Sequence, residues 1–180
     1  MYSKSIGSKN LNRHLEAETL DRLVLLLKPK LKQCGFKKRG LTWSVAGKDC
    51  TLIINIQKSI FGPGAYLNAG LFLHALHPDA NSRRLFYQSD IYFRVANVIP
   101  HHNQELAVLV RRLEQGESMS DGSCDQLCNG LMEVIAGLLH LLDLGALRLR
   151  VEQLAEYSLV NPEVRKFVLE CPQCECDNDT

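Results

Sequence analysis

The chain has 180 residues, the length of one ordinary globular domain. Its 46% hydrophobic and 23% charged residues exclude an intrinsically disordered or collagen-like chain, because both classes depart strongly from this composition. With 21 basic against 20 acidic residues the net charge is +1, so no bulk field favours nucleic acid or an anionic membrane, and we expect neither as a partner.

The first expected element is a helix over residues 12–34. Apolar side chains that recur at the spacing of one helical face are Leu20, Leu23, Val24, Leu27 and Leu31. Pro29 interrupts this run and should kink the helix or start a separate last turn, because its ring excludes one intrahelical hydrogen bond. Gly35 lies where the left-handed residue after a helix belongs.

The middle of the chain predicts an antiparallel meander of four strands, over residues 41–45, 50–58, 66–76 and 90–98. A turn at Gly47-Lys48 would pair Trp43 with Leu52, and a loop centred between residues 62 and 63 would pair Gln57 with Asn68. Both hairpins place their apolar side chains on the same face, which we expect a wrong register not to do.

The last third predicts helices over residues 103–116, 123–142, about 145–157 and from 162 onward. Asn103 should cap the first of these, and Ser123 the second. Strands followed by helices, without alternation, are typical of the α+β class. We therefore expect an α+β fold, a four-stranded meander with helices on one face, in a single domain over residues 1–170. A flexible Cys-rich tail should follow over residues 171–180.

Three short motifs lie in the first half of the chain: GFKKRGLTW at residues 35–43, NIQKS at 55–59 and LNAG at 67–70. Together they resemble the bacterial family called domain of unknown function 4304, over about residues 20–98. The resemblance implies an α+β cytosolic domain without an established activity, and it brings no catalytic residues with it. Residues 121–180 are outside the pattern.

The predicted face opposite the apolar one carries the candidate binding residues. They are Asn55, Gln57, Tyr66, Asn68, His74, Tyr92 and Arg94. Amides both donate and accept hydrogen bonds, and tyrosine and arginine are enriched where protein interfaces are strongest. This set predicts a surface that binds a polar ligand or a protein partner.

Seven cysteines, an odd number, and an N-terminus without an apolar segment predict reduced thiols in the cytoplasm. Cys171, Cys174 and Cys176 include one C-x2-C pair, a spacing typical of zinc ligands. A fourth ligand is missing nearby, so Cys34, Cys50 or an aspartate would have to supply it. No cofactor is expected otherwise.

Three functions remain open at this stage. The first is a non-catalytic bacterial module that binds a protein partner on the polar face, and an immunity-type protein is one such case. The second is a small-ligand binder or enzyme with a pocket between the sheet and the later helices, using His74, Tyr92 and Arg94. The third is zinc binding through the tail. The leucines of the last third would serve a homodimer interface or only the core.

Overall fold

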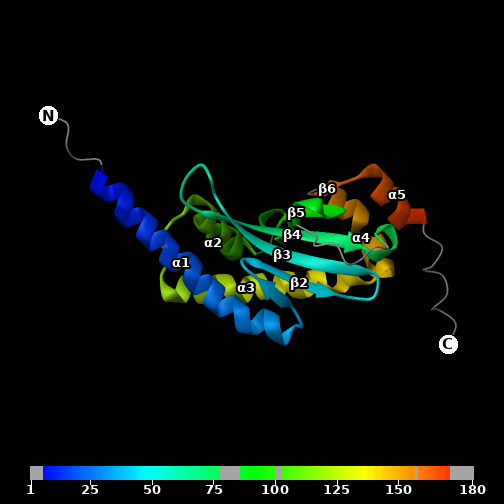
Figure 1. Ribbon diagram of the computed structural model, residues 1–180, viewed down its shortest axis with the longest axis horizontal. Coiled ribbons are helices and arrows are strands. Elements are labelled where there is room, and N and C mark those ends of the chain that lie inside the picture. The colour runs from blue at the N-terminus through cyan, green and yellow to red at the C-terminus, as the bar shows by residue number, and fades with distance from the viewer. Residues whose placement is uncertain (1–5, 78–85, 100–102, 157, 171–180) are drawn as a thin grey trace.

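The computed structural model describes residues 6–77, 86–99, 103–156 and 158–170, and it has the expected α+β architecture (Figure 1). The helices are α1 (Ile6–Gln33), α2 (Gln104–Gln115), α3 (Asp121–Leu139), α4 (Leu144–Ala155) and α5 (Pro162–Glu170). The strands are β1 (Lys37–Arg39), β2 (Thr42–Ala46), β3 (Cys50–Lys58), β4 (Ala65–Leu73), β5 (Ile91–Arg94) and β6 (Leu159–Val160). Four short 3-10 turns complete the regular secondary structure: His74–Leu76, Phe86–Gln88, Val95–Val98 and His140–Leu142.

The sheet is antiparallel and its six described strands lie in chain order, from β1 to β6. The expectation of four strands was therefore too low. β1 was missed because its three residues are charged and exposed, so they carry no alternating pattern. A two-residue turn joins it to β2, and Gly40, with φ +59°, gives this turn the left-handed residue that it requires. β6 has only two residues.

The predicted pairing was wrong by two residues in both hairpins. Trp43 pairs with Ile54 rather than Leu52, and Asn68 pairs with Asn55 rather than Gln57. Each turn is centred one residue away from the predicted position, and this moves the partner by two. Because side chains alternate with a period of two, the faces are nevertheless as predicted.

The apolar face of the sheet packs against the helices and forms the core. Its strand residues are Trp43, Leu52, Ile54, Ile56, Leu67, Ala69, Leu71, Leu73, Ile91 and Phe93. Leucines of α1 complete this core together with Leu109 of α2, Leu131 of α3 and Leu147 of α4. Full burial of one such side chain contributes about 1.5–3 kcal/mol, so this layer supplies most of the stability of the sheet.

Helix α1 continues through Pro29, contrary to the predicted interruption. The carbonyl that Pro29 leaves without its intrahelical donor is that of Leu25, whose side chain is 66% exposed. Because this side of the helix faces solvent, water can satisfy that carbonyl, and the helix continues without a separate last turn. Gly35 follows with φ +83°, as expected.

The capping prediction was right for α2 and wrong for α3. Asn103 accepts a hydrogen bond from the backbone of Leu106 at the start of α2. Helix α3 begins three residues earlier than expected, because Ser120 rather than Ser123 caps it.

Candidate functional site

One continuous row of side chains crosses the outer face, the side of the sheet opposite the helices. Consecutive pairs in the register of β1 to β5 make up this cross-strand row, which is Arg39, Thr42, Asn55, Asn68 and Arg94. Directly paired residues of neighbouring strands point to the same face, so the five side chains are neighbours. The row brings Asn55, Asn68 and Arg94 together, as predicted, and adds Arg39, which the sequence analysis missed with its strand.

A chain of hydrogen bonds runs through the middle of this row. The Tyr92 hydroxyl donates to Oδ1 of Asn68 at 3.1 Å, and Nδ2 of Asn68 donates to Oε1 of Gln57 at 3.2 Å. Asn68 is completely buried, whereas Gln57 is exposed. The network therefore fixes the exposed Gln57 amide at the surface through an inner amide that cannot rotate freely.

Asn55 is held from its other side. Its Nδ2 donates to Oγ1 of Thr42 at 2.8 Å and to the Leu41 carbonyl at 3.4 Å. Its Oδ1 is buried and has no hydrogen-bond partner among the described residues. A buried acceptor without a donor lowers stability by about 1–3 kcal/mol. An amide retained at such a cost is typical of positions that serve function rather than stability.

The guanidinium of Arg94 lies over the ring of Tyr66, with Cζ 3.8 Å from the ring centroid. One guanidinium nitrogen, Nη1, is 3.9 Å from Oε1 of Glu114 on α2, and the arginine side chain remains 43% exposed. Burial raises the pKa of Glu114, although the positive charges of Arg94 and Arg111 act in the opposite direction. Arg94 is thus oriented by a ring and a carboxylate and still faces solvent.

The other half of the outer face is covered, so the face is less open than predicted. Phe72 is 1% exposed and Ile53 is 4% exposed, yet neither belongs to the main core. The turn Phe86–Gln88 and Ser89 lie over Gly70, whose Cα approaches Ser89 so closely that an added Cβ would be 2.0 Å from Oγ. The open half contains Gln57, Tyr66 and the cross-strand row; within the row Arg39 and Arg94 are exposed, whereas Asn55 and Asn68 are buried.

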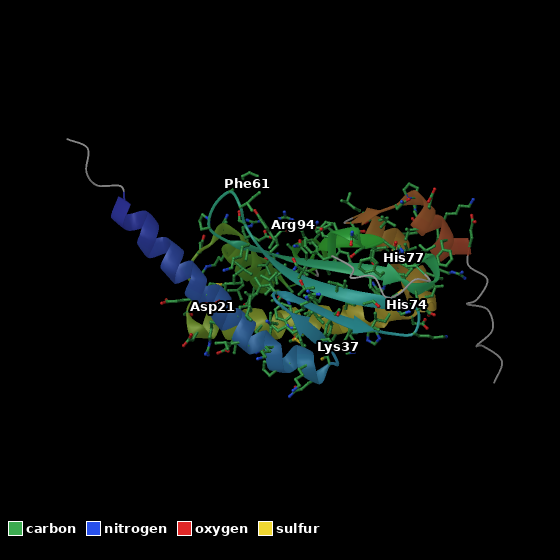
Figure 2. All side chains as sticks on the ribbon, in the orientation of Figure 1. Asp21, Lys37, Phe61, His74, His77 and Arg94 are labelled. Carbon is green, nitrogen blue, oxygen red and sulfur yellow. The ribbon has the colours of Figure 1, made fainter. Side chains whose placement is uncertain are left out.

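His74 lies outside this open half. Its Nε2 is 2.9 Å from Oγ1 of Thr51, and its Nδ1 is 3.3 Å from the Lys48 carbonyl. It begins the 3-10 turn that follows β4, six residues beyond Asn68 and thus up to about 20 Å away at ~3.3 Å per residue, and Figure 2 shows it toward the opposite end of the sheet from Arg94. The structure therefore brings Tyr92 and Arg94 together but not His74.

A second histidine makes a contact that the sequence analysis did not propose. His77 Nε2 is 2.8 Å from Oδ1 of Asp90, and the carboxylate also accepts a hydrogen bond from the backbone of Leu73. The His77 ring meets Phe72 edge-on, with centroids 5.9 Å apart. These contacts fasten the end of β4 to the start of β5 and support the covered half of the outer face.

Two pockets lie elsewhere on the described surface. One of about 150 Å³ lies between Thr19 of α1, the β3–β4 loop and Gly116 at the end of α2. The other, of about 470 Å³, lies beside α5 and includes Val160 and Leu169 in its lining. Neither is lined by any of the predicted binding residues.

The predicted zinc ligands Cys171, Cys174 and Cys176 lie outside the described residues. Within residues 6–77, 86–99, 103–156 and 158–170 there is no group of three or more His, Cys, Asp or Glu side chains that could hold a metal ion. Of the two cysteines considered as a fourth ligand, Cys34 is exposed and Cys50 is buried. Burial, followed by the charges of nearby aspartates, raises the pKa of Cys50 to about 12, which disfavours the thiolate that zinc requires.

The β3–β4 loop carries two exposed apolar side chains, Ile60 at 85% and Phe61 at 94% exposure. Figure 2 shows Phe61 on this loop. The sequence analysis used this loop only to set the pairing of its two strands. Its base is fixed on α2, because the Cα of Gly64 lies against the Glu114 carbonyl.

These features define an α+β domain with helices on one face of an antiparallel sheet and a partly open polar face on the other. Residues 27–136, more than half of the chain, match the family model described as Domain of unknown function (DUF4304), and the chain belongs to this family. This match confirms the family resemblance inferred from the motifs, but it extends to residue 136, so the expectation that residues 121–136 lie outside the pattern was wrong. Comparisons with curated proteins and with solved structures each gave no match. No helix in the described part of the chain is long and apolar enough to cross a membrane.

Proposed function

We propose that this protein is a non-catalytic binding module and that the open half of its outer face binds a protein partner. The observation that carries the proposal is Arg94, which is stacked on Tyr66, faces Glu114 and is still 43% exposed. An arginine held in one orientation loses little conformational entropy on binding, and arginine and tyrosine are the side chains most often found at energetic centres of interfaces.

The amides beside Arg94 support the same conclusion. Gln57 is exposed and its Oε1 is fixed by Asn68, so its Nε2 remains a donor at a defined position. Asn55 retains a buried acceptor without a partner. Amide groups complement the backbone of another protein, since each can donate and accept.

The test is affinity capture of the tagged protein from the cells that naturally express it, with partners identified by mass spectrometry. We expect one near-stoichiometric partner. Arg94→Glu, Arg94→Gln and Gln57→Ala should each reduce its recovery, the arginine variants by about tenfold or more, because a lost charge-assisted contact contributes ~1.5–3 kcal/mol.

Arg150→Glu is the matched control, because Arg150 is exposed on α4, in the helical layer away from the outer face. A partner retained by both Arg94 variants and by Gln57→Ala would place the interface elsewhere. An immunity-type function makes one further demand, which is that the captured partner is toxic when it is expressed alone.

A further inference from the structure

The strand residues of the outer face include positively charged side chains and no negatively charged ones. Lys37 and Arg39 lie on this side because they pair with Ser44 and Thr42, and both are exposed. Arg94 lies at the other end of the row, where Glu114 of α2 is 3.9 Å from Nη1 and the arginine side chain is still 43% exposed. The sequences of β1 to β5 contain no aspartate or glutamate. Residues 28–48 as a whole contain seven basic and no acidic side chains, so the charge near β1 is not neutralised within the segment.

The spacing of the two arginines sets the length of a complementary ligand. Arg39 and Arg94 are four strand-to-strand steps apart, about 19 Å of backbone at ~4.8 Å per step. An extended peptide advances ~3.3 Å per residue, so about six residues would join them. Between the arginines the row has only uncharged polar side chains.

We infer that the partner presents an extended acidic segment that lies across the strands, with one carboxylate at Arg39 and a second at Arg94. Arginine binds carboxylates through paired N–H groups in a planar fork, and the exposed Gln57 amide is placed to bond the backbone of the segment. The inference rests on the proposed function and specifies the chemistry of the partner.

A nucleic acid fits this face less well than an acidic peptide. Its backbone carries one charge for every nucleotide and is bound by cations spread along the groove. Here three uncharged side chains separate the two arginines. A base would need the face of the Tyr66 ring for stacking, and Arg94 already lies over that face.

The probe is poly-L-glutamate, added to the full-length protein labelled with 15N and followed by NMR. The side-chain amides of Asn55, Gln57 and Asn68 and the Nε–H of Arg94 are reporters that the face itself supplies. We expect these signals to shift with poly-L-glutamate, to a smaller extent at high salt, and to be unaffected by poly-L-lysine. A DNA duplex at equal charge concentration is the competing ligand.

Two double variants separate this site from general attraction to positive charge. Arg39→Gln/Arg94→Gln should lower the affinity for poly-L-glutamate at least about tenfold, and Lys28→Gln/Lys32→Gln, the same change of charge at exposed lysines of α1, less than about twofold. Equal losses in the two variants, no binding, or tighter binding of DNA would overturn the inference.

If poly-L-glutamate does not bind while the captured partner still depends on Arg94, the acidic segment is wrong and the proposed function stands. If the partner is indifferent to Arg94, the proposed function is wrong whatever poly-L-glutamate does.

Discussion

Arg94 stacks on Tyr66, although the register pairs Arg94 with Asn68 and Tyr66 with Gln57. The two side chains are diagonal neighbours across β4 and β5. β5 ends at Arg94, and the guanidinium lies over the Tyr66 ring. Glu114 of α2 is 3.9 Å from the same guanidinium.

The first prediction concerns the energy of this stack. The single variants Arg94→Gln and Tyr66→Leu and the double variant form a cycle whose coupling free energy should be about 0.5–1 kcal/mol, the range for a partly exposed cation–π pair. Urea unfolding measures it. A coupling near zero would mean that the stack is a geometric consequence of the short strand and contributes no orientation energy to Arg94.

The second prediction concerns the buried amide. Asn68→Ala should lower the free energy of unfolding by about 2 kcal/mol, because it leaves the Tyr92 hydroxyl and the Gln57 carbonyl without their partner and opens a small void. Gln57→Ala is the comparison on the adjacent strand, and its loss should be smaller, about 1 kcal/mol, because it removes one of the two hydrogen bonds and leaves only Nδ2 of Asn68 without its acceptor. Denaturant unfolding measures both losses. Similar losses in the two variants would contradict the claim that Asn68 is the residue that holds Tyr92 and Gln57 in place.

The sequence was sufficient to predict which face of each strand is apolar, and therefore which side carries Asn55, Asn68 and Arg94. The alternation of side chains has a period of two, so it determines the face whatever the exact turn. For the same reason it does not determine the pairing. A turn one residue away leaves the pattern intact and changes the partner of Asn68 from Gln57 to Asn55.

Other parts of the site have no signal in local patterns. Arg39 joins the row through a three-residue exposed strand without apolar side chains. Ser89 covers Gly70, and the two residues are 19 positions apart in the sequence, so the local alternation of side chains does not predict this contact. His74 and Arg94 are far apart because Arg94 pairs with Asn68, six residues before His74. The sequence pattern does not give that pairing.

The third prediction concerns the base of the β3–β4 loop. Gly64 has φ +114°, and a Cβ at this position would lie 2.2 Å from the Glu114 carbonyl oxygen. Gly64→Ala should therefore lower stability by more than about 2 kcal/mol, since both the backbone conformation and the contact with α2 are disturbed. Gly62→Ala in the same loop has no atom within 4 Å of its new Cβ and should change stability by less than about 0.5 kcal/mol. Equal effects would show that the loop is not fixed on α2.

The fourth prediction concerns the thiols. In the folded protein Cys34 should react with a thiol reagent, whereas Cys50, Cys124 and Cys128 should not, because these three are buried and burial raises the pKa of each. Mass spectrometry of peptides after brief labelling distinguishes these sites from the three cysteines of residues 171–180. All should react once the chain is unfolded. Labelling of Cys50 at the rate of Cys34 in the native protein would mean that the sheet opens at β3 on the timescale of the reaction.

The last prediction follows from Glu114, whose pKa is raised above its ordinary value of 4.5 mainly by burial. The folded protein therefore holds this proton to a higher pH than the unfolded chain does. Its contribution to stability is fully present below about 4.5 and is lost as the pH rises toward the pKa of the folded state.

Glu114→Gln removes this dependence. As the pH rises from about 4.5 to the pKa of Glu114 in the folded state, the variant should therefore gain unfolding free energy relative to the natural protein. Above that pKa the difference should be constant. Glu105→Gln, at an exposed glutamate of the same helix, corrects for the loss of one negative charge from α2. The opposite slope would mean that the attraction of Arg94 and Arg111 exceeds the effect of burial, and that Glu114 is a firm counter-ion which a carboxylate of the partner must displace.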